Sequence, residues 1–71
     1  MMSYDERLAF DRLYNQGIEC EKNGNFASAI NKYQIAMEIA KLANDSAVND
    51  CQEKIEYCQK LLKQKNIELE M

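Results

Sequence analysis

The distribution of chain-breaking residues is the feature that most constrains how this sequence can fold. The 71 residues contain no proline and only two glycines, Gly17 and Gly24. Two polar clusters, at residues 23–25 and 44–46, therefore give the clearest turn signals, and they divide the chain into three pieces. Within each piece the apolar residues recur at steps of three and four, which is the period of an amphipathic helix and not the alternation of a strand.

These three pieces predict an all-α fold, an antiparallel three-helix bundle that occupies one domain over residues 1–71. A chain of this length has room for a single hydrophobic core. Ser3 and Glu6 form the S-x-x-E pattern of a capping box, so the first helix should begin directly after Ser3. Gly24 suits the left-handed conformation that ends a helix, and Asn25 can cap the next helix. The predicted helices cover residues 4–23, 26–43 and 46–66.

Each predicted helix carries an apolar face that can meet its neighbours. Small and large residues alternate on the second helix, so a neighbouring backbone can approach closely at its alanines. The third helix should be capped from Asn44, Asp45 or Ser46, and its last residues, from Lys65 to Met71, are expected to fray. The predicted core positions are Leu8, Phe10, Leu13, Tyr14, Gly17, Ile18 and Cys20, then Phe26, Ala29, Ile30, Tyr33, Ala36, Met37 and Ala40, then Val48, Cys51, Ile55, Cys58, Leu62 and Leu69.

Charge and hydropathy restrict the possible partners. Nine Lys and Arg residues against twelve Asp and Glu residues give a formal net charge of −3, which removes the electrostatic basis for binding nucleic acid. The apolar stretches are far shorter than the roughly 20 residues that span a bilayer, and the N-terminus lacks the basic flank and apolar stretch of a signal peptide. We therefore expect a cytoplasmic protein without direct membrane insertion, whose partners are other proteins.

The sequence offers little for catalysis or metal binding. Histidine is absent, so the commonest general base and metal ligand is missing. Cys20, Cys51 and Cys58 form no C-x-x-C pair and suggest neither a zinc site nor a disulfide framework. Cys51 and Cys58 fall on the apolar face of the third helix, where packing in the core is the expected role. We therefore expect no enzymatic activity, no cofactor and no metal site.

The spacing between residues 13 and 40 is more specific than a general helical period. Glycine, alanine or an aromatic residue stands at Gly17, Gly24, Phe26, Ala29, Tyr33 and Ala36. This pattern resembles one tetratricopeptide repeat, a 34-residue helix-turn-helix unit. We expect the two helices to cross closely where Gly17 faces Ala29. The sequence departs from that family at Leu13, Gln16, Cys20 and Lys41, where tryptophan, leucine, tyrosine and proline are usual.

A hairpin of this kind with one longer third helix is also similar to the microtubule-interacting and trafficking domain of membrane-remodelling ATPases. Residues 24–36 resemble the second helix of that family, and Glu56-Tyr57-Cys58 resembles a Glu-Tyr-Leu motif on its third helix. The segment between Tyr33 and Tyr57 is shorter than is usual there, and alanine is preferred where Gly17 stands. The resemblance implies that acidic helical tails bind against the second and third helices.

Apolar residues beside the core face of the second helix are the candidates for a binding surface. Ile35, Ile39 and Leu42 make the C-terminal half of this helix apolar nearly all round, and such a helix is covered on two sides. Either the third helix covers them completely, or they leave a surface for binding or self-association. Lysines between residues 54 and 65 form either an ordinary solvated face or the basic rim of a groove. The predicted partner-binding residues are Ile35, Met37, Ile39, Leu42, Lys60 and Lys63.

We therefore predict a non-enzymatic protein–protein interaction module that binds a peptide or a helix of a partner protein in a groove beside the second and third helices. The alternative is a homodimer in which the third helices pack together, which would make the protein a small oligomeric scaffold or regulator. The small core makes either arrangement plausible, because a partner surface would add to the buried apolar area.

Overall fold

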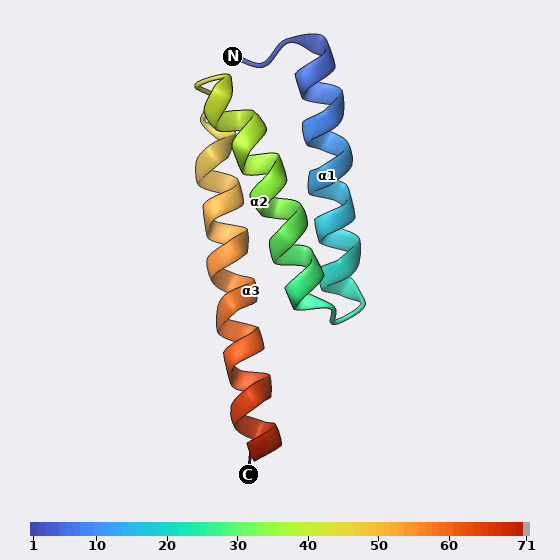
Figure 1. Cartoon of the computed structure of the whole chain (residues 1–71), viewed down its shortest axis with the longest axis vertical. Helices are drawn as coiled ribbons and strands as arrows, with labels where there is room; N and C mark the ends of the chain where they lie inside the picture. The colour runs from blue at the N-terminus through green and yellow to red at the C-terminus, as the bar shows by residue number, and fades with distance from the viewer. Residues whose placement is uncertain (71) are drawn as a thin grey trace.

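The computed structural model describes residues 1–70, with side chains up to Gln64. Three α-helices follow one another, α1 (Tyr4–Lys22), α2 (Phe26–Leu42) and α3 (Ala47–Glu70), each antiparallel to the one before it (Figure 1). The described part of the chain contains no strand. The all-α three-helix prediction is confirmed. α3 continues to Glu70, beyond the predicted end at residue 66.

Side chains cap the start of each helix. The Ser3 hydroxyl accepts a hydrogen bond from the backbone N–H of Glu6 at 3.2 Å, and the Glu6 carboxylate accepts one from the N–H of Ser3 at 2.9 Å. This reciprocal pair is the predicted capping box. The Asn25 side chain caps α2, as predicted. At α3 the cap comes from Asp45, whose carboxylate accepts from the N–H of Ala47 at 2.9 Å.

The two turns between the helices share one geometry. After α1, the N–H of Gly24 donates to the carbonyl of Glu21 at 3.0 Å, and the N–H of Asn25 donates to the carbonyl of Cys20 at 2.8 Å. Gly24 has φ 77°, the left-handed conformation that the sequence predicted for it. The same pair of bonds, at 3.1 and 2.9 Å, closes α2, where Asn44 has φ 52°. Both turns therefore reverse the chain sharply and hold successive helices side by side.

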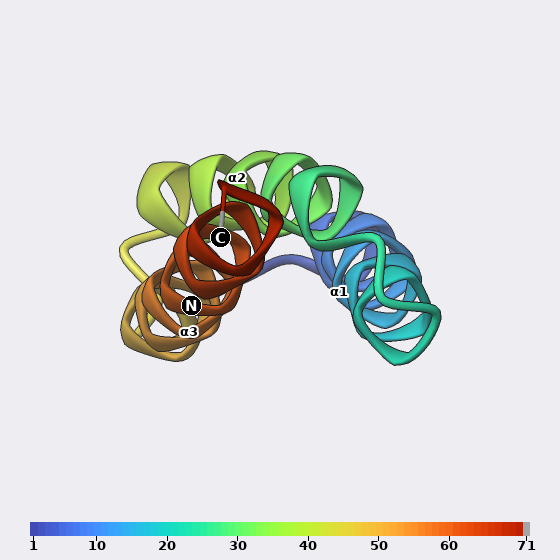
Figure 2. The same ribbon diagram turned by 90° about the horizontal axis from the view of Figure 1, so that it is seen from below.

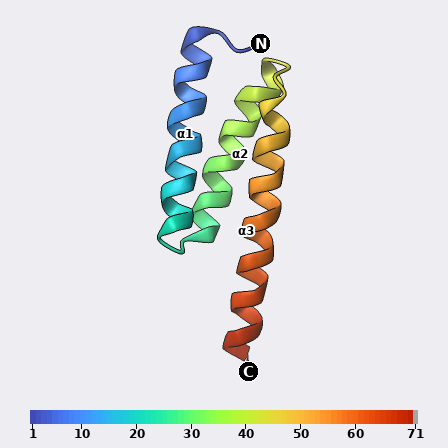
Figure 3. The same ribbon diagram turned by 180° about the vertical axis from the view of Figure 1, so that it is seen from behind.

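The three helices form an open arch. α2 packs against both α1 and α3, whereas α1 and α3 approach each other at few points. Seen along the molecule, α2 lies at the top of the arch and the other two helices form its sides (Figure 2). The view from behind shows α2 between its neighbours and α3 extending beyond both of them at its C-terminal end (Figure 3). This arrangement leaves a concave face between α1 and α3.

Two clusters of buried side chains hold the arch together, and Met37 packs against both. One predicted core position is wrong, because Leu8 is 53% exposed. Leu8 precedes the buried Phe10 by two residues, which places it about 200° round the helix from Phe10. Leu69 lies outside the described side chains. The buried residues of the two clusters are Phe10, Ala36, Ala40, Ala47 and Cys51 in one, and Ala29, Tyr33, Ile55 and Cys58 in the other.

The close crossing of α1 and α2 depends on Gly17. A Cβ atom at this position would lie 2.6 Å from Cε1 of Tyr33, well inside van der Waals contact. The predicted close approach is confirmed, but the nearest atoms belong to Tyr33 and not to Ala29. The Tyr33 ring is fully buried and its hydroxyl donates to Glu21 at 3.0 Å, so the ring cannot move aside freely.

We expect Gly17→Ala to lower the free energy of unfolding by up to about 2 kcal/mol. Alanine favours a helix over glycine by about 1 kcal/mol, but overpacking against the fixed ring of Tyr33 costs up to about 3 kcal/mol. Urea unfolding followed by circular dichroism would measure the difference. Gln16→Ala is the matched control, because Gln16 is exposed on the same helix and should keep its stability. Equal stability of the two variants would contradict the contact.

Candidate functional site: the groove between α1 and α3

The concave face contains two adjoining hollows of about 440 and 380 Å³. Tyr14 of α1 and Asp50 of α3 line both of them, so the hollows are continuous, and we call them together the groove. The first is lined by Tyr14, Glu21, Asp50, Glu53, Lys54 and Tyr57. The second is lined by Arg7, Phe10, Asp11, Tyr14, Asp45, Ser46, Ala47 and Asp50.

Packed aromatic rings give the groove a firm wall on the α1 side. The rings of Phe10 and Tyr14 stack with their centroids 5.6 Å apart, and the ring of Tyr14 meets that of Tyr33 at 5.4 Å with a tilt of 57°. Burial, followed by the nearby carboxylate of Asp50, raises the pKa of the Tyr14 phenol above its usual value. Tyr57 lies on the α3 side and is 53% exposed. Both walls therefore present a tyrosine to a ligand.

Glu21 joins all three helices at one end of the groove. Its Oε1 accepts a hydrogen bond from the Tyr33 hydroxyl of α2 at 3.0 Å and one from the Cys58 thiol of α3 at 3.5 Å. Burial, followed by this hydrogen bond, raises the pKa of the Cys58 thiol to about 11. Both donors are therefore neutral near pH 7, and both stay bonded to the carboxylate. Sequence reasoning did not single out Glu21, although its position seven residues after Tyr14 marks the same helix face.

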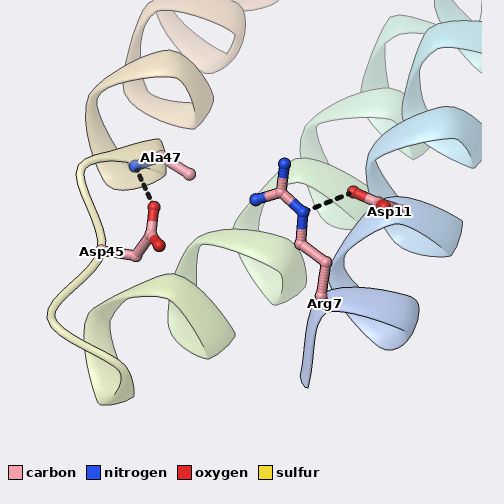
Figure 4. A network of polar contacts seen from close by, with 4 residues as sticks. All are labelled: Arg7, Asp11, Asp45 and Ala47. Atoms are coloured by element: carbon pink, nitrogen blue, oxygen red, sulfur yellow. Dashed lines mark hydrogen bonds and ion pairs between the residues drawn. The ribbon is translucent and has the colours of Figure 1, made fainter. Parts of the chain in front are cut away.

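The other end of the groove carries exposed charges. Arg7 Nε lies 3.6 Å from the Asp11 carboxylate, and both side chains are more than half exposed. Figure 4 shows Arg7 on the side of α1 that faces the α2–α3 turn, beside Asp11 and across from the cap of α3 formed by Asp45 and Ala47. An exposed pair of this kind contributes about 1 kcal/mol or less, so a charged ligand can compete with it at little cost.

Most of the unbalanced charge of the protein lies in the groove. The two hollows are lined by two cations, Arg7 and Lys54, and by five carboxylates, Asp11, Glu21, Asp45, Asp50 and Glu53. The whole chain has nine basic and twelve acidic residues. Among residues 1–64, whose side chains the structure describes, six basic and five acidic residues lie outside the two hollows, so the excess of negative charge in this part of the chain lies in the groove lining.

None of the six residues predicted to bind a partner lines the two hollows, but Lys60 lines a third hollow, which shares Glu53 and Tyr57 with the first. On α2, Met37 and Ile39 are partly buried and pack against the core, whereas Ile35 is 43% and Leu42 is 82% exposed. α3 therefore covers only part of the apolar surface that the sequence marked on α2. A free apolar strip remains.

The two predicted lysines lie at a different place along the bundle. Lys60 and Lys63 are exposed and follow Cys58, which packs with Ala29 near the N-terminal end of α2. Leu42 is the last residue of α2, about 20 Å from Ala29 along a helix that rises 1.5 Å per residue. The structure therefore does not bring the lysines and Leu42 together, and a binding role for the six residues stays a prediction.

Sequence reasoning named Tyr57 only within a motif and Lys54 only within a run of lysines, and it did not identify the α3 wall of the groove. Asp50, Lys54 and Tyr57 are spaced by four and three residues, so they share one face of the helix, and this spacing could have identified them. These residues form a wall only because α3 stands at a certain distance from α1, and no local sequence pattern indicates that distance.

Comparison of the chain with protein-family models, with curated proteins and with solved structures gave no match. Within the described residues, no helix combines the length and the apolar character needed to cross a lipid bilayer. The same part of the chain holds no group of three or more Cys, Asp or Glu side chains arranged to bind a metal ion.

Proposed function

We propose that this protein is a non-enzymatic interaction module of the cytoplasm, an adaptor that binds a peptide or a helix of a partner protein in the groove. The observation that carries the proposal is the open arch, which leaves a continuous hollow between α1 and α3 instead of a closed core. The resemblance to a tetratricopeptide repeat agrees with this role, since stacked repeats of that family present a concave face to their ligands.

The walls of the groove suit protein recognition. Tyr14 and Tyr57 face the first hollow from opposite helices, and tyrosine is enriched among the residues that dominate binding energy. Tyr14 is held in place by its contacts with Phe10 and Tyr33, so little conformational entropy is lost when a ligand binds it. The groove thus replaces the predicted site beside the second and third helices as the leading candidate.

Two matched variants test the proposal. Peptides are first selected from a displayed random library on the unmodified protein, and their Kd values are then measured on Tyr57→Ala and Leu42→Ala. Both changes truncate an exposed side chain, but only Tyr57 lines the groove. We expect Tyr57→Ala to weaken binding by about 10-fold or more and Leu42→Ala by less than about 2-fold.

The reverse pattern would contradict the groove and favour the surface beside α2 and α3. A library that yields no binding peptide at all would contradict the interaction module itself. Circular dichroism of both variants checks that the helices are intact.

A second candidate function, self-association, is favoured by the apolar strip on α2. Ile35 and Leu42 are exposed and lie seven residues apart on one helix face, with Ile39 between them. Sedimentation equilibrium should then show a dimer that Leu42→Glu dissociates. A monomer at about 100 μM would contradict this candidate, since the free energy of dimerisation would then be less favourable than about −5 kcal/mol.

A further inference from the structure

The charge of the groove indicates which class of partner it binds. We infer that the groove takes a basic segment of a partner protein, one that carries several Lys or Arg side chains. This inference rests on the proposed function and deepens it. The hollows hold five carboxylates against two cations, whereas the other described side chains, up to Gln64, include six basic and five acidic residues.

The α3 wall supplies the carboxylates that a ligand can use most directly. Among the described residues, Asp50 and Glu53 form no ion pair within 4.0 Å, although Lys54 lines the same hollow. Both are exposed, so a ligand cation can reach them without displacing a protein group. Glu21, by contrast, already accepts two hydrogen bonds and serves mainly as a fixed negative charge at the end of the groove.

The concave shape strengthens the effect of these charges. A cleft lined by one sign of charge between low-dielectric walls focuses the electrostatic potential and attracts ligands of the opposite sign. Asp50, Glu21 and Glu53 all act on the Tyr14 phenol and contribute to its raised pKa, after burial. Carboxylates of both α1 and α3 therefore contribute to the electrostatic potential at Tyr14, in the middle of the groove.

The tyrosines add a second reason to expect basic residues. A Lys or Arg side chain can place its cation over the face of a tyrosine ring, which contributes about 0.5–1 kcal/mol at exposed sites. Tyr57 and Glu53 line the first hollow from α3, and Tyr14 of α1 lines it together with Asp50 of α3, so each aromatic ring has a carboxylate in the same hollow. An acidic tail, as the trafficking-domain resemblance implies, would meet repulsion here. Lys60 lines only the neighbouring hollow beside Glu53 and Tyr57, where Glu56 balances its charge.

Three synthetic helical peptides of about 16 residues provide the test. They share the same Leu and Ala positions and differ only in five further positions, which are all Lys, all Gln or all Glu. Fluorescence anisotropy gives their Kd values at low and at higher salt. We expect the Lys peptide to bind at least about 10-fold more tightly than the Gln peptide, the Glu peptide not to bind, and the difference to shrink between about 50 and 300 mM NaCl.

A matched pair of charge variants assigns this preference to the groove. The variant D50N/E53Q removes two negative charges from the groove. It should weaken binding of the Lys peptide by about 3- to 10-fold and have little effect on binding of the Gln peptide. The control E19Q/E38Q removes the same charge from exposed positions that line neither hollow, and it should weaken binding by less than about 2-fold.

Three outcomes would overturn the inference: tighter or equal binding of the Gln or Glu peptide, equal effects of the two double variants, or no binding of the Lys peptide. The proposed function survives each of them if library-selected peptides still bind in a manner sensitive to Tyr57→Ala. The proposed function is contradicted separately if the Kd values of those peptides are the same for Tyr57→Ala and for the unmodified protein.

Discussion

Replacing Tyr33 by alanine is expected to lower the free energy of unfolding by about 4 kcal/mol, because truncation of a buried aromatic residue costs about 3–5 kcal/mol. Tyr33 is fully buried, its ring lies against Gly17 and Tyr14, and its hydroxyl donates to Glu21. The side chain therefore fills the space at which all three helices meet. A domain of this size has only a few kcal/mol of stability, so Tyr33→Ala should be largely unfolded in water at 25 °C.

Circular dichroism and urea unfolding would measure this loss. Tyr57→Ala is the matched control, because Tyr57 is half exposed and its truncation should cost less than about 1 kcal/mol. Tyr33→Phe keeps the ring and removes only the hydroxyl, and it should cost about 1 kcal/mol through the lost hydrogen bond. Similar stability of Tyr33→Ala and Tyr57→Ala would contradict the central position of Tyr33.

The second large effect is a loss of stability in alkaline solution. Burial raises the pKa of the Cys51 and Cys58 thiols from 9.0 to about 11 in the folded protein. The unfolded chain releases these protons near pH 9, whereas the folded chain retains them, so the unfolded state gains stability as the pH rises. The stability is fully present below about pH 9 and is lost between about pH 9 and 11. Two pKa units correspond to about 3 kcal/mol for each thiol.

Urea unfolding midpoints between about pH 7 and 11 would show this decline. The double variant C51A/C58A is the control, because burial also raises the pKa of Tyr14 and Tyr33, and this contribution is the same in both proteins. Its stability at pH 7 should be lower through the lost packing, but its decline with pH should be shallower by most of the amount attributed to the thiols. Parallel profiles for the two proteins would show that the thiols titrate normally.

Local signals predicted the helices and their ends well. Ser3 with Glu6, Gly24 and Asn25 act through hydrogen bonds and backbone conformations that span a few residues, so their roles can be recognised without knowledge of the fold. The core faces followed from helical periodicity for the same reason. Leu8 was assigned wrongly because an apolar residue near a buried face need not lie on it.

Three helices, their caps and most of the residues that they bury could be predicted from local patterns, because each of these depends on neighbours one or two turns apart. The packing of the helices in three dimensions sets α1 and α3 apart, brings Glu21 to Tyr33 and Cys58, and gathers five carboxylates against two cations in the space between the outer helices. Those features depend on how far residues from different helices lie from one another, and that distance is set by the packing of Tyr33 and the alanines of α2, not by any local pattern.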